Sequence, residues 1–324
     1  MASNKYTAVG FIGLGIMGFP MLENLIKKAP STTKFYIYDV MAPALEKMAS
    51  NYPDQVTVCG SSKEVAERSE VIISMVPEGS HVRSVYLTPD TGVLAADVSG
   101  KLLIDSSTID TATSLQVREE TLKKYPTASF FDAPVSGGQL GAQKGTLTFM
   151  VGSKEDDPEF PVLQHLLGMM GANIVPCGGP SLGLTAKLCH NYCSAMIAIA
   201  TSESMNIGVK AGMDPRVLAN VFHNSVAQST VCDKWCPVPG VVPGCPASNG
   251  YRGGFRVQLM RKDVGLAVDT AKRVGATLAL GGAGLQCYTD AANDPKCKDL
   301  DSRVVYRFLG GNENWDGKQA EREA

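Results

Sequence analysis

The chain has 324 residues, enough for a large α/β domain followed by a smaller second domain. Hydrophobic residues make up 44% and charged residues 19% of it, a composition that excludes disordered and fibrous proteins. The 30 basic and 32 acidic residues leave a formal net charge of −2, so we predict neither a nucleic-acid nor a membrane partner. The first residues contain neither an apolar signal core nor an arginine-rich amphipathic segment, and we expect any targeting peptide to be absent or removed.

The nine cysteines do not form the dense pattern of a disulfide scaffold, and they indicate a reducing, intracellular environment. Five of them lie in apolar runs and are predicted to be small buried side chains: Cys59, Cys177, Cys189, Cys193 and Cys287. Cys232, Cys236 and Cys245 lie in a predicted loop with the spacing C-x3-C-x8-C. Because a zinc site usually needs paired short spacings and a fourth ligand, we predict free thiols there and no metal.

The first half of the chain alternates short apolar runs with helical stretches. The predicted strands are residues 7–13, 35–39, 56–59, 71–76, 102–105, 129–134, 146–152 and 173–177. Helices are predicted between most of them, for example at 42–50, 110–124 and 156–170. The strands are continuous apolar runs, which is typical of a parallel sheet covered by helices on both faces. We therefore predict a doubly wound, Rossmann-type α/β domain over residues 1–180, with right-handed crossovers.

After Gly178-Gly179-Pro180 the strand pattern disappears. The predicted helices are 183–211, 214–226, 256–274, 281–293 and 299–309, with a Pro/Gly-rich loop at 236–254. We predict an all-α domain over 181–310 that begins with a long connecting helix, and a fraying polar tail over 311–324. The uncharged run 188–202 is shorter than the ~20 residues of a membrane span and is predicted to be a buried helix.

Three glycines near the start of the chain have the spacing G-x-G-x-x-G within the sequence GFIGLGIMG. They follow an apolar strand and open a helix, the context in which this pattern binds a dinucleotide. Gly13 is expected to allow a tight turn, Gly15 the approach of a pyrophosphate, and Gly18 close packing of helix on sheet. The predicted cofactor-binding residues of this loop are Gly13, Leu14, Gly15, Ile16, Met17 and Gly18. The alternative is that the glycines only form a sharp turn.

An acid ends the second predicted strand. Asp39 lies 21 positions after Gly18, close to the ~20 expected for the carboxylate that binds the adenosine ribose. Such a carboxylate accepts hydrogen bonds from both ribose hydroxyls and repels a 2′-phosphate. Because residues 40–42 include no arginine to hold that phosphate, we predict NAD rather than NADP as the cofactor.

The helix predicted to begin at Gly183 carries only one lysine or arginine before Lys210. Lys187, Asn191 and Ser194 follow steps of four and three and form a polar stripe on one helical face. Gly183, one turn earlier, is expected to leave room for a ligand. Partial burial lowers the pKa of a lysine, as a general acid/base requires, and we predict this role for Lys187. The alternative is a surface lysine that reaches solvent.

Two further segments follow predicted strands at their carboxyl ends, where open α/β sheets bind ligands. In the sequence DAPVSGG, Ser136, Gly137 and Gly138 offer a hydroxyl and bare backbone N–H groups. These groups suit a carboxylate, and the alternative is a simple turn. In DSSTID, Thr108 is a candidate contact of the nicotinamide half of the cofactor. Thr108 or Asp110 is equally suited to cap the next helix.

The strand predicted at 71–76 ends in the sequence MVPEG. Val76 and Pro77 are predicted cofactor contacts, with Pro77 shaping the wall beside the nicotinamide ribose. Glu78 and His81 follow in this segment.

Four motifs occur in the order GFIGLGIMG, DAPVSGG, GLTAKLCHN and RKDVGLA. With them the chain resembles the β-hydroxyacid dehydrogenases, which have the 6-phosphogluconate dehydrogenase-like fold, from the glycine loop to about Phe308. The resemblance implies that Lys187 is the catalytic lysine, that the segment 136–138 binds the substrate carboxylate, and that Asn191 orients the substrate.

The same resemblance implies roles for residues of the helical domain and a reaction. Lys262 is expected near the nicotinamide and the substrate, with Asp263 fixing it, and Phe255 is expected in the wall of the cleft. The implied reaction is the NAD-dependent oxidation of 3-hydroxyisobutyrate to methylmalonate semialdehyde, a step of valine breakdown. A homodimer or homotetramer and the mitochondrial matrix are also implied, with the cytosol as the alternative compartment.

Two alternatives to this function stay open. One is another β-hydroxyacid dehydrogenase, such as a tartronate-semialdehyde (2-hydroxy-3-oxopropionate) reductase, and the other is a non-catalytic Rossmann binding module. The chain also departs from the family pattern at His190, where an asparagine is usual, although Asn191 keeps its place one turn from Lys187. Glu78 and His81 replace small polar residues, and we predict His81 as a cofactor-side contact or a surface residue.

Overall fold

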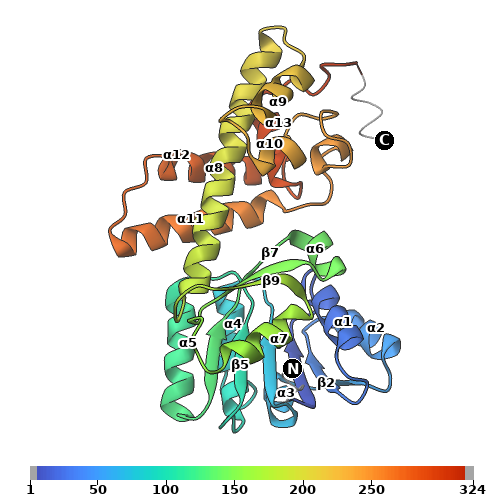
Figure 1. Cartoon of the computed structure of the whole chain (residues 1–324), viewed down its shortest axis with the longest axis vertical. Helices are drawn as coiled ribbons and strands as arrows, with labels where there is room; N and C mark the ends of the chain where they lie inside the picture. The colour runs from blue at the N-terminus through green and yellow to red at the C-terminus, as the bar shows by residue number, and fades with distance from the viewer. Residues whose placement is uncertain (1–5, 318–324) are drawn as a thin grey trace. The chain divides into compact units, whose positions relative to one another are not determined.

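The structure, a computed structural model, describes residues 6–317 of the chain (Figure 1). The chain divides into two compact units, Met1–Lys187 and Leu188–Ala324. All nine strands of the described residues belong to the first unit, whereas the second is helical apart from one isolated bridge between Arg256 and Asp301. This distribution confirms the predicted fold class, an α/β region followed by a helical one.

The first unit is built around a six-stranded parallel sheet with the strand order β3-β2-β1-β4-β5-β6. The strands are β1 (Ala8–Ile12), β2 (Lys34–Tyr38), β3 (Val56–Val58), β4 (Val71–Ser74), β5 (Leu102–Asp105) and β6 (Ser129–Asp132). This is the order of a doubly wound dinucleotide-binding fold, in which ligands bind at the carboxyl ends of the strands. The last residues of β5 and β6, Asp105 and Asp132, are register partners at that edge.

Helices cover both faces of this sheet. Two buried clusters lie on its opposite sides. One cluster contains side chains of α1 (Gly18–Lys28), α2 (Ala42–Asn51) and α7 (Phe160–Gly168). The other contains side chains of α3 (Ser62–Arg68), α4 (Gly79–Leu87), η1 (Val93–Ala95) and α5 (Thr111–Lys124). The sheet is therefore a buried layer between two layers of helices.

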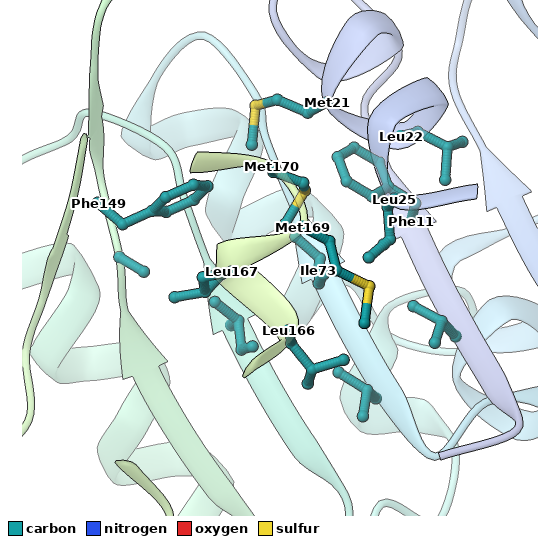
Figure 2. Packing of buried hydrophobic residues seen from close by; sticks show 14 of the residues in the cluster. Phe11, Met21, Leu22, Leu25, Ile73, Phe149, Leu166, Leu167, Met169 and Met170 are labelled. Carbon is teal, nitrogen blue, oxygen red and sulfur yellow. The ribbon is translucent and has the colours of Figure 1, made fainter. Parts of the chain in front are cut away.

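The strand sequences are continuous apolar runs because both faces of each strand are buried. In β4, Val71 and Ile73 belong to the first cluster and Ile72 to the second. Successive side chains of a strand point to opposite faces, so each residue must be apolar. Figure 2 shows residues of the first cluster that come from the sheet, α1, β8 and α7: Phe11, Ile73, Met21, Leu22, Leu25, Phe149, Leu166 and Leu167.

A second, three-stranded sheet follows in the same unit. It consists of β7 (Val135–Ser136), β8 (Leu147–Val151) and β9 (Gly171–Pro176), with α6 (Gly138–Lys144) between β7 and β8. The strands β7 and β8 are antiparallel, whereas β8 and β9 are parallel and are joined by α7. Sequence analysis predicted the last two strands but neither the short β7 nor their separation from the main sheet, since strand pairing is not encoded in the apolar runs themselves.

The second unit is helical. It contains the following elements: most of α8 (Leu182–Lys210), α9 (Pro215–His223), α10 (Thr230–Lys234), η2 (Pro246–Asn249), α11 (Val257–Val274), α12 (Gly281–Asn293), η3 (Ser302–Val304) and α13 (Val305–Phe308). Asp214 caps α9 by accepting a hydrogen bond from Arg216 N at 2.8 Å. The largest core cluster of this unit joins α8, α11 and α12. Tyr288 of α12 is fully buried and donates a hydrogen bond to Ala195 O of α8 at 3.2 Å.

The cysteines correct two expectations. Cys189 and Cys193 are exposed on α8. They are four residues apart and therefore lie on the same face of the helix, which is not covered. Cys232, Cys236 and Cys245 are free thiols, but they are buried, and Cys232 lies in α10 rather than in a loop. Burial raises the pKa of Cys236 to about 12, which keeps this thiol protonated. In residues 6–317 no group of three His, Cys, Asp or Glu side chains is placed to hold a metal.

Part of the segment for which we predicted a fraying tail is packed in the structure. The guanidinium of Arg307 donates to Glu313 Oε1 at 2.6 Å, and Trp315 Nε1 donates to Pro239 O at 2.8 Å. Residues 318–324 lie outside the described part. Among residues 6–317, none of the helices combines the length and the apolar character needed to span a bilayer.

Candidate active site

The glycine loop has a different geometry at each glycine. Gly13 adopts a φ of +95°, the left-handed region that favours glycine, and donates to Tyr38 O at 3.0 Å. At Gly18, the first residue of α1, a Cβ atom would overlap the carbonyl oxygen of Gly13. At Gly15 a Cβ atom would meet no other atom within 4 Å. The loop is therefore tightly turned and closely packed at its ends, and it is open in its middle.

Asp39 is bonded to the glycine loop. Its Oδ2 accepts a hydrogen bond from Leu14 N at 2.5 Å, and its Oδ1 accepts one from Met41 N at 2.7 Å. The carboxylate thus fixes the backbone of the loop, a contact that sequence analysis did not predict. The following Val40 and Met41 are 86% and 61% exposed and carry no positive charge.

A buried hydrogen-bond network joins the carboxyl ends of β4 and β5. Asp105 Oδ1 accepts from Ser74 Oγ at 2.8 Å and from Ser107 Oγ at 2.6 Å. Ser107 Oγ in turn accepts from Val76 N at 2.9 Å. Burial raises the pKa of Asp105 to about 6. The network holds Val76, a predicted cofactor contact, against the segment that carries Thr108.

The N-terminal cap of α5 decides between Thr108 and Asp110 as the capping residue. Asp110, and not Thr108, caps α5, because its Oδ1 accepts from Thr113 N at 2.8 Å. Thr108 is half-buried. Pro77 and Glu78 are exposed immediately before α4, and His81 is exposed in its first turn.

The segment predicted to bind a carboxylate is an exposed turn between β7 and α6. Ser136 ends β7 and pairs with Thr148 of β8. Gly137 and Gly138 both adopt positive φ, at +132° and +61°, and a Cβ atom at Gly138 would meet nothing within 4 Å. The backbone N–H groups are therefore presented by a turn that only glycines adopt easily.

The start of α8 is bound to the end of β6. Asp132 is 2% exposed, and it accepts hydrogen bonds from Ser181 N at 2.7 Å and from Leu184 N at 2.8 Å. The expected role of Gly183 is wrong: a Cβ atom there would overlap the carbonyl oxygen of Met150, so this glycine lets α8 pack on β8 rather than making room for a ligand. Lys187, one turn after Leu184, is 7% exposed.

Polar groups in the second unit form a chain of contacts. Asn191 is 5% exposed, and its Nδ2 donates to Asp263 Oδ2 at 2.5 Å. Lys262 Nζ lies 3.2 Å from Asp263 Oδ1, an ion pair that agrees with the contact implied by the family resemblance. His190 Nδ1 lies 2.9 Å from Asn191 Oδ1. Because Asp263 can only accept from the amide of Asn191, the oxygen of that amide faces His190.

Phe255 precedes α11 and is held by a buried acid. Asp301 Oδ2 accepts from Phe255 N at 2.8 Å, and Phe255 O accepts from Ser302 N at 2.8 Å. Asp301 also forms an ion pair with Arg303 at 3.2 Å. A Cβ atom at Gly254 would overlap Asp301 Oδ2, which explains the glycine before this phenylalanine.

Two families of known proteins match successive parts of the chain. Residues 8–179 match the NAD binding domain of 6-phosphogluconate dehydrogenase, and residues 182–309 match the NAD-binding family of NADP-dependent 3-hydroxyisobutyrate dehydrogenase. The chain is 42% identical to the probable mitochondrial 3-hydroxyisobutyrate dehydrogenase of Dictyostelium discoideum, over 96% of this chain and 94% of that one. The chain belongs to the 3-hydroxyisobutyrate dehydrogenase family.

Further members of the 3-hydroxyisobutyrate dehydrogenase family agree with this. The human mitochondrial 3-hydroxyisobutyrate dehydrogenase is 42% identical over 95% of this chain and 88% of its own. The solved structure of Mycobacterium tuberculosis 3-hydroxyisobutyrate dehydrogenase with L-serine is 34% identical, with a TM-score of 0.84 over 94% of this chain and 99% of that one. As a member of this family the chain is an NAD-dependent hydroxyacid dehydrogenase, which confirms the predicted class of enzyme and cofactor.

The glycine loop of this dehydrogenase fits a dinucleotide. The open space at Gly15 leaves its backbone accessible, while Gly13 and Gly18 close the turn around it.

Sequence analysis missed the roles of Asp105 and Asp132, although both are acids at the ends of apolar strands. That position was a usable signal, because a charged residue next to a buried strand is rarely placed there without a partner.

Proposed function

We propose that this enzyme oxidises 3-hydroxyisobutyrate to methylmalonate semialdehyde with NAD+ as the hydride acceptor. The observation that carries the proposal is Lys187, a buried lysine in the first turns of α8 within the motif GLTAKLCHN. The relatives named for this substrate are similar over nearly the whole chain, which supports the same substrate here.

In the proposed mechanism the residues of the first unit bind the substrate and move a proton. The hydroxyl of Ser136 and the N–H groups of Gly137 and Gly138 hold the substrate carboxylate. Lys187 Nζ accepts the proton of the substrate hydroxyl while the hydrogen on the carbon that bears this hydroxyl leaves with its electron pair. In the reverse reaction Lys187 returns the proton. Bound NAD+ supplies the acceptor for that hydride.

The cofactor contacts are assigned to the glycine loop and to three neighbouring segments. The proposed residues are Gly13, Leu14, Gly15, Ile16, Met17, Gly18, Asp39, Val76, Pro77, His81 and Thr108, with Lys262 from the second unit. Asp39 favours NAD+ over NADP+, because its carboxylate repels a 2′-phosphate and the exposed Val40 and Met41 offer no cation to hold one.

In the second unit we assign three substrate contacts. Asn191 orients the substrate through an amide that is fixed by Asp263. Lys262 supplies positive charge for the substrate carboxylate, and the ion pair with Asp263 fixes its ammonium group. Phe255 provides an apolar contact and is held in place through its backbone by Asp301.

A panel of short hydroxy acids tests the substrate. The purified enzyme is given NAD+ and, in turn, 3-hydroxyisobutyrate, 3-hydroxypropionate, glycerate and L-serine, and NADH formation is followed by absorbance. We expect the highest kcat/KM for 3-hydroxyisobutyrate. The highest kcat/KM for glycerate would assign the chain to tartronate-semialdehyde reduction instead, and no NADH formation from any of the four acids would refute the proposal.

We further propose that the enzyme forms a homodimer or homotetramer and acts in the mitochondrial matrix. The mitochondrial names of the Dictyostelium and human relatives support this compartment. Light scattering of the purified protein measures its mass in solution, and a monomer would contradict the assembly. Imaging of the tagged full-length protein tests the compartment, and an exclusively cytosolic signal would contradict it.

A further inference from the structure

The carboxylate of Asp132 connects two segments of the first unit that are distant in the sequence. It lies at the end of β6, and its hydrogen-bond donors Ser181 and Leu184 are 49 and 52 positions later, at the start of α8. Backbone N–H groups at a helix start have no partner within the helix and carry partial positive charge. The carboxylate therefore both caps α8 and offsets the positive end of its dipole.

The surroundings of this carboxylate are built to enclose it. A Cβ atom at Gly152 would overlap Asp132 Oδ1, and one at Gly183 would come within 2.8 Å of Asp132 Oδ2. Burial raises the pKa of Asp132, so the protein holds an acid where a charge is costly. Two glycines and two backbone donors thus converge on one side chain.

The same residues are tied to the turn that presents Ser136. Asp132 O accepts from Gly152 N at 2.8 Å, and two residues later Pro134 O accepts from Met150 N at 3.0 Å. Ser136 pairs with Thr148. The strand β8 therefore holds the segment 132–136 on one side, while its Met150 carbonyl contacts α8 at Gly183.

We propose that Asp132 is a positioning residue that fixes the first turn of α8, and with it Lys187, relative to the turn at Ser136. This inference rests on the proposed function, since it assigns Lys187 and Ser136 to the same reaction. Lys187 follows the capped Leu184 by three residues, so any loosening of this turn displaces the amine. A displacement of ~1 Å costs about 100-fold in rate when a reacting group must be aligned.

The test is Asp132→Asn, which keeps the shape of the side chain but sets an amide NH2 group against one of the two N–H donors. The control is Asp214→Asn, the same substitution at the cap of α9, a helix that carries none of the proposed site residues. For each variant we measure kcat and KM for 3-hydroxyisobutyrate, the NAD+ Kd by calorimetry, and amide hydrogen exchange by mass spectrometry.

For Asp132→Asn we expect kcat to fall by about tenfold or more, with an NAD+ Kd within about twofold of the wild type. Faster exchange should be confined to the segment 181–187, and Asp214→Asn should leave kcat within about twofold of the wild type. An unchanged kcat in Asp132→Asn would overturn the inference. A joint loss of kcat, of NAD+ affinity and of protection from hydrogen exchange throughout the first unit would also overturn the inference, because such a loss would show that Asp132 has a general structural role.

Should Asp132→Asn fail to fold, Asp132→Ser, which keeps a capping hydroxyl, is expected to show the same separation of kcat from NAD+ Kd, and the same outcomes decide. If the wild type does not oxidise 3-hydroxyisobutyrate, the proposed function fails by itself. Hydrogen exchange of Asp132→Asn then tests the inference: a loss of protection confined to residues 181–187 supports the positioning role of Asp132, and unchanged protection refutes it.

Discussion

Replacing Asp105 by asparagine removes a buried charge while keeping the shape of the side chain. Asp105 is fully buried, and its Oδ1 accepts from Ser74 and Ser107. Within the described residues its Oδ2 has no hydrogen-bond partner. Burial raises the pKa of the carboxyl from 3.8 to about 6 in the folded protein. The ionised form is therefore less favourable in the folded than in the unfolded state.

The size and sign of the effect follow from this pKa. The rise is about two pKa units, and each unit corresponds to about 1.4 kcal/mol, so the effect is at most about 3 kcal/mol. Between pH 4 and 6 the folded state binds more protons at Asp105 than the unfolded state, and stability falls as the pH rises. The amide of the Asp105→Asn variant is neutral throughout this range. The free energy of unfolding of the variant should therefore rise relative to the wild type by up to about 3 kcal/mol between pH 4 and pH 7.

The assay is denaturant unfolding of both proteins at a series of pH values across this window. Contributions of acids that do not interact with Asp105, such as Asp301, are common to both proteins and cancel in the difference, whereas the repulsion between Asp105 and Asp132 is part of the measured effect. A difference that does not change with pH would refute the reasoning, because it would show that the carboxyl of Asp105 has the same affinity for protons in both states.

Three further outcomes are expected. Lys187→Ala should lower kcat by about 100-fold or more and leave the NAD+ Kd nearly unchanged. The control Lys210→Ala, at the exposed end of α8, should change neither kcat nor the NAD+ Kd, and near-normal turnover of Lys187→Ala would exclude the proton-transfer role. The wild type should prefer NAD+ to NADP+ in kcat/KM, and Asp39→Asn should narrow this preference about tenfold, or ~1.4 kcal/mol; equal use of both cofactors by the wild type would contradict the role of Asp39. Gly183→Ala should lower the free energy of unfolding by about 1–3 kcal/mol because its methyl group overlaps Met150 O, whereas Gly168→Ala, where a Cβ meets open space, should change it little; equal values for the two would argue against the close contact.

Much of the fold and the cofactor loop could be predicted from the sequence because these features depend on local patterns. Continuous apolar runs alternating with helical stretches require a parallel sheet with two covered faces, and the division of Ile72 and Ile73 between two clusters shows this arrangement. The spacing of Gly13, Gly15 and Gly18 predicts this loop, since Gly13 has a positive φ, a side chain at Gly18 would overlap Gly13 O, and the space at Gly15 is open. The long helix after the sheet was predicted from its composition as 183–211 and is observed as Leu182–Lys210.

By itself the sequence thus determined the class of fold, the glycine loop and the residues that make a dehydrogenase recognisable. The tertiary structure alone decided which polar groups meet. Asp132 reaches its partners across about 50 positions of the chain, Gly183 faces the backbone of β8 rather than a ligand, and Cys189 lies on an uncovered face of α8. The physical reason is that periodicity and turn preferences act over a few residues, whereas burial and hydrogen-bond partners are set by packing between segments far apart in the chain.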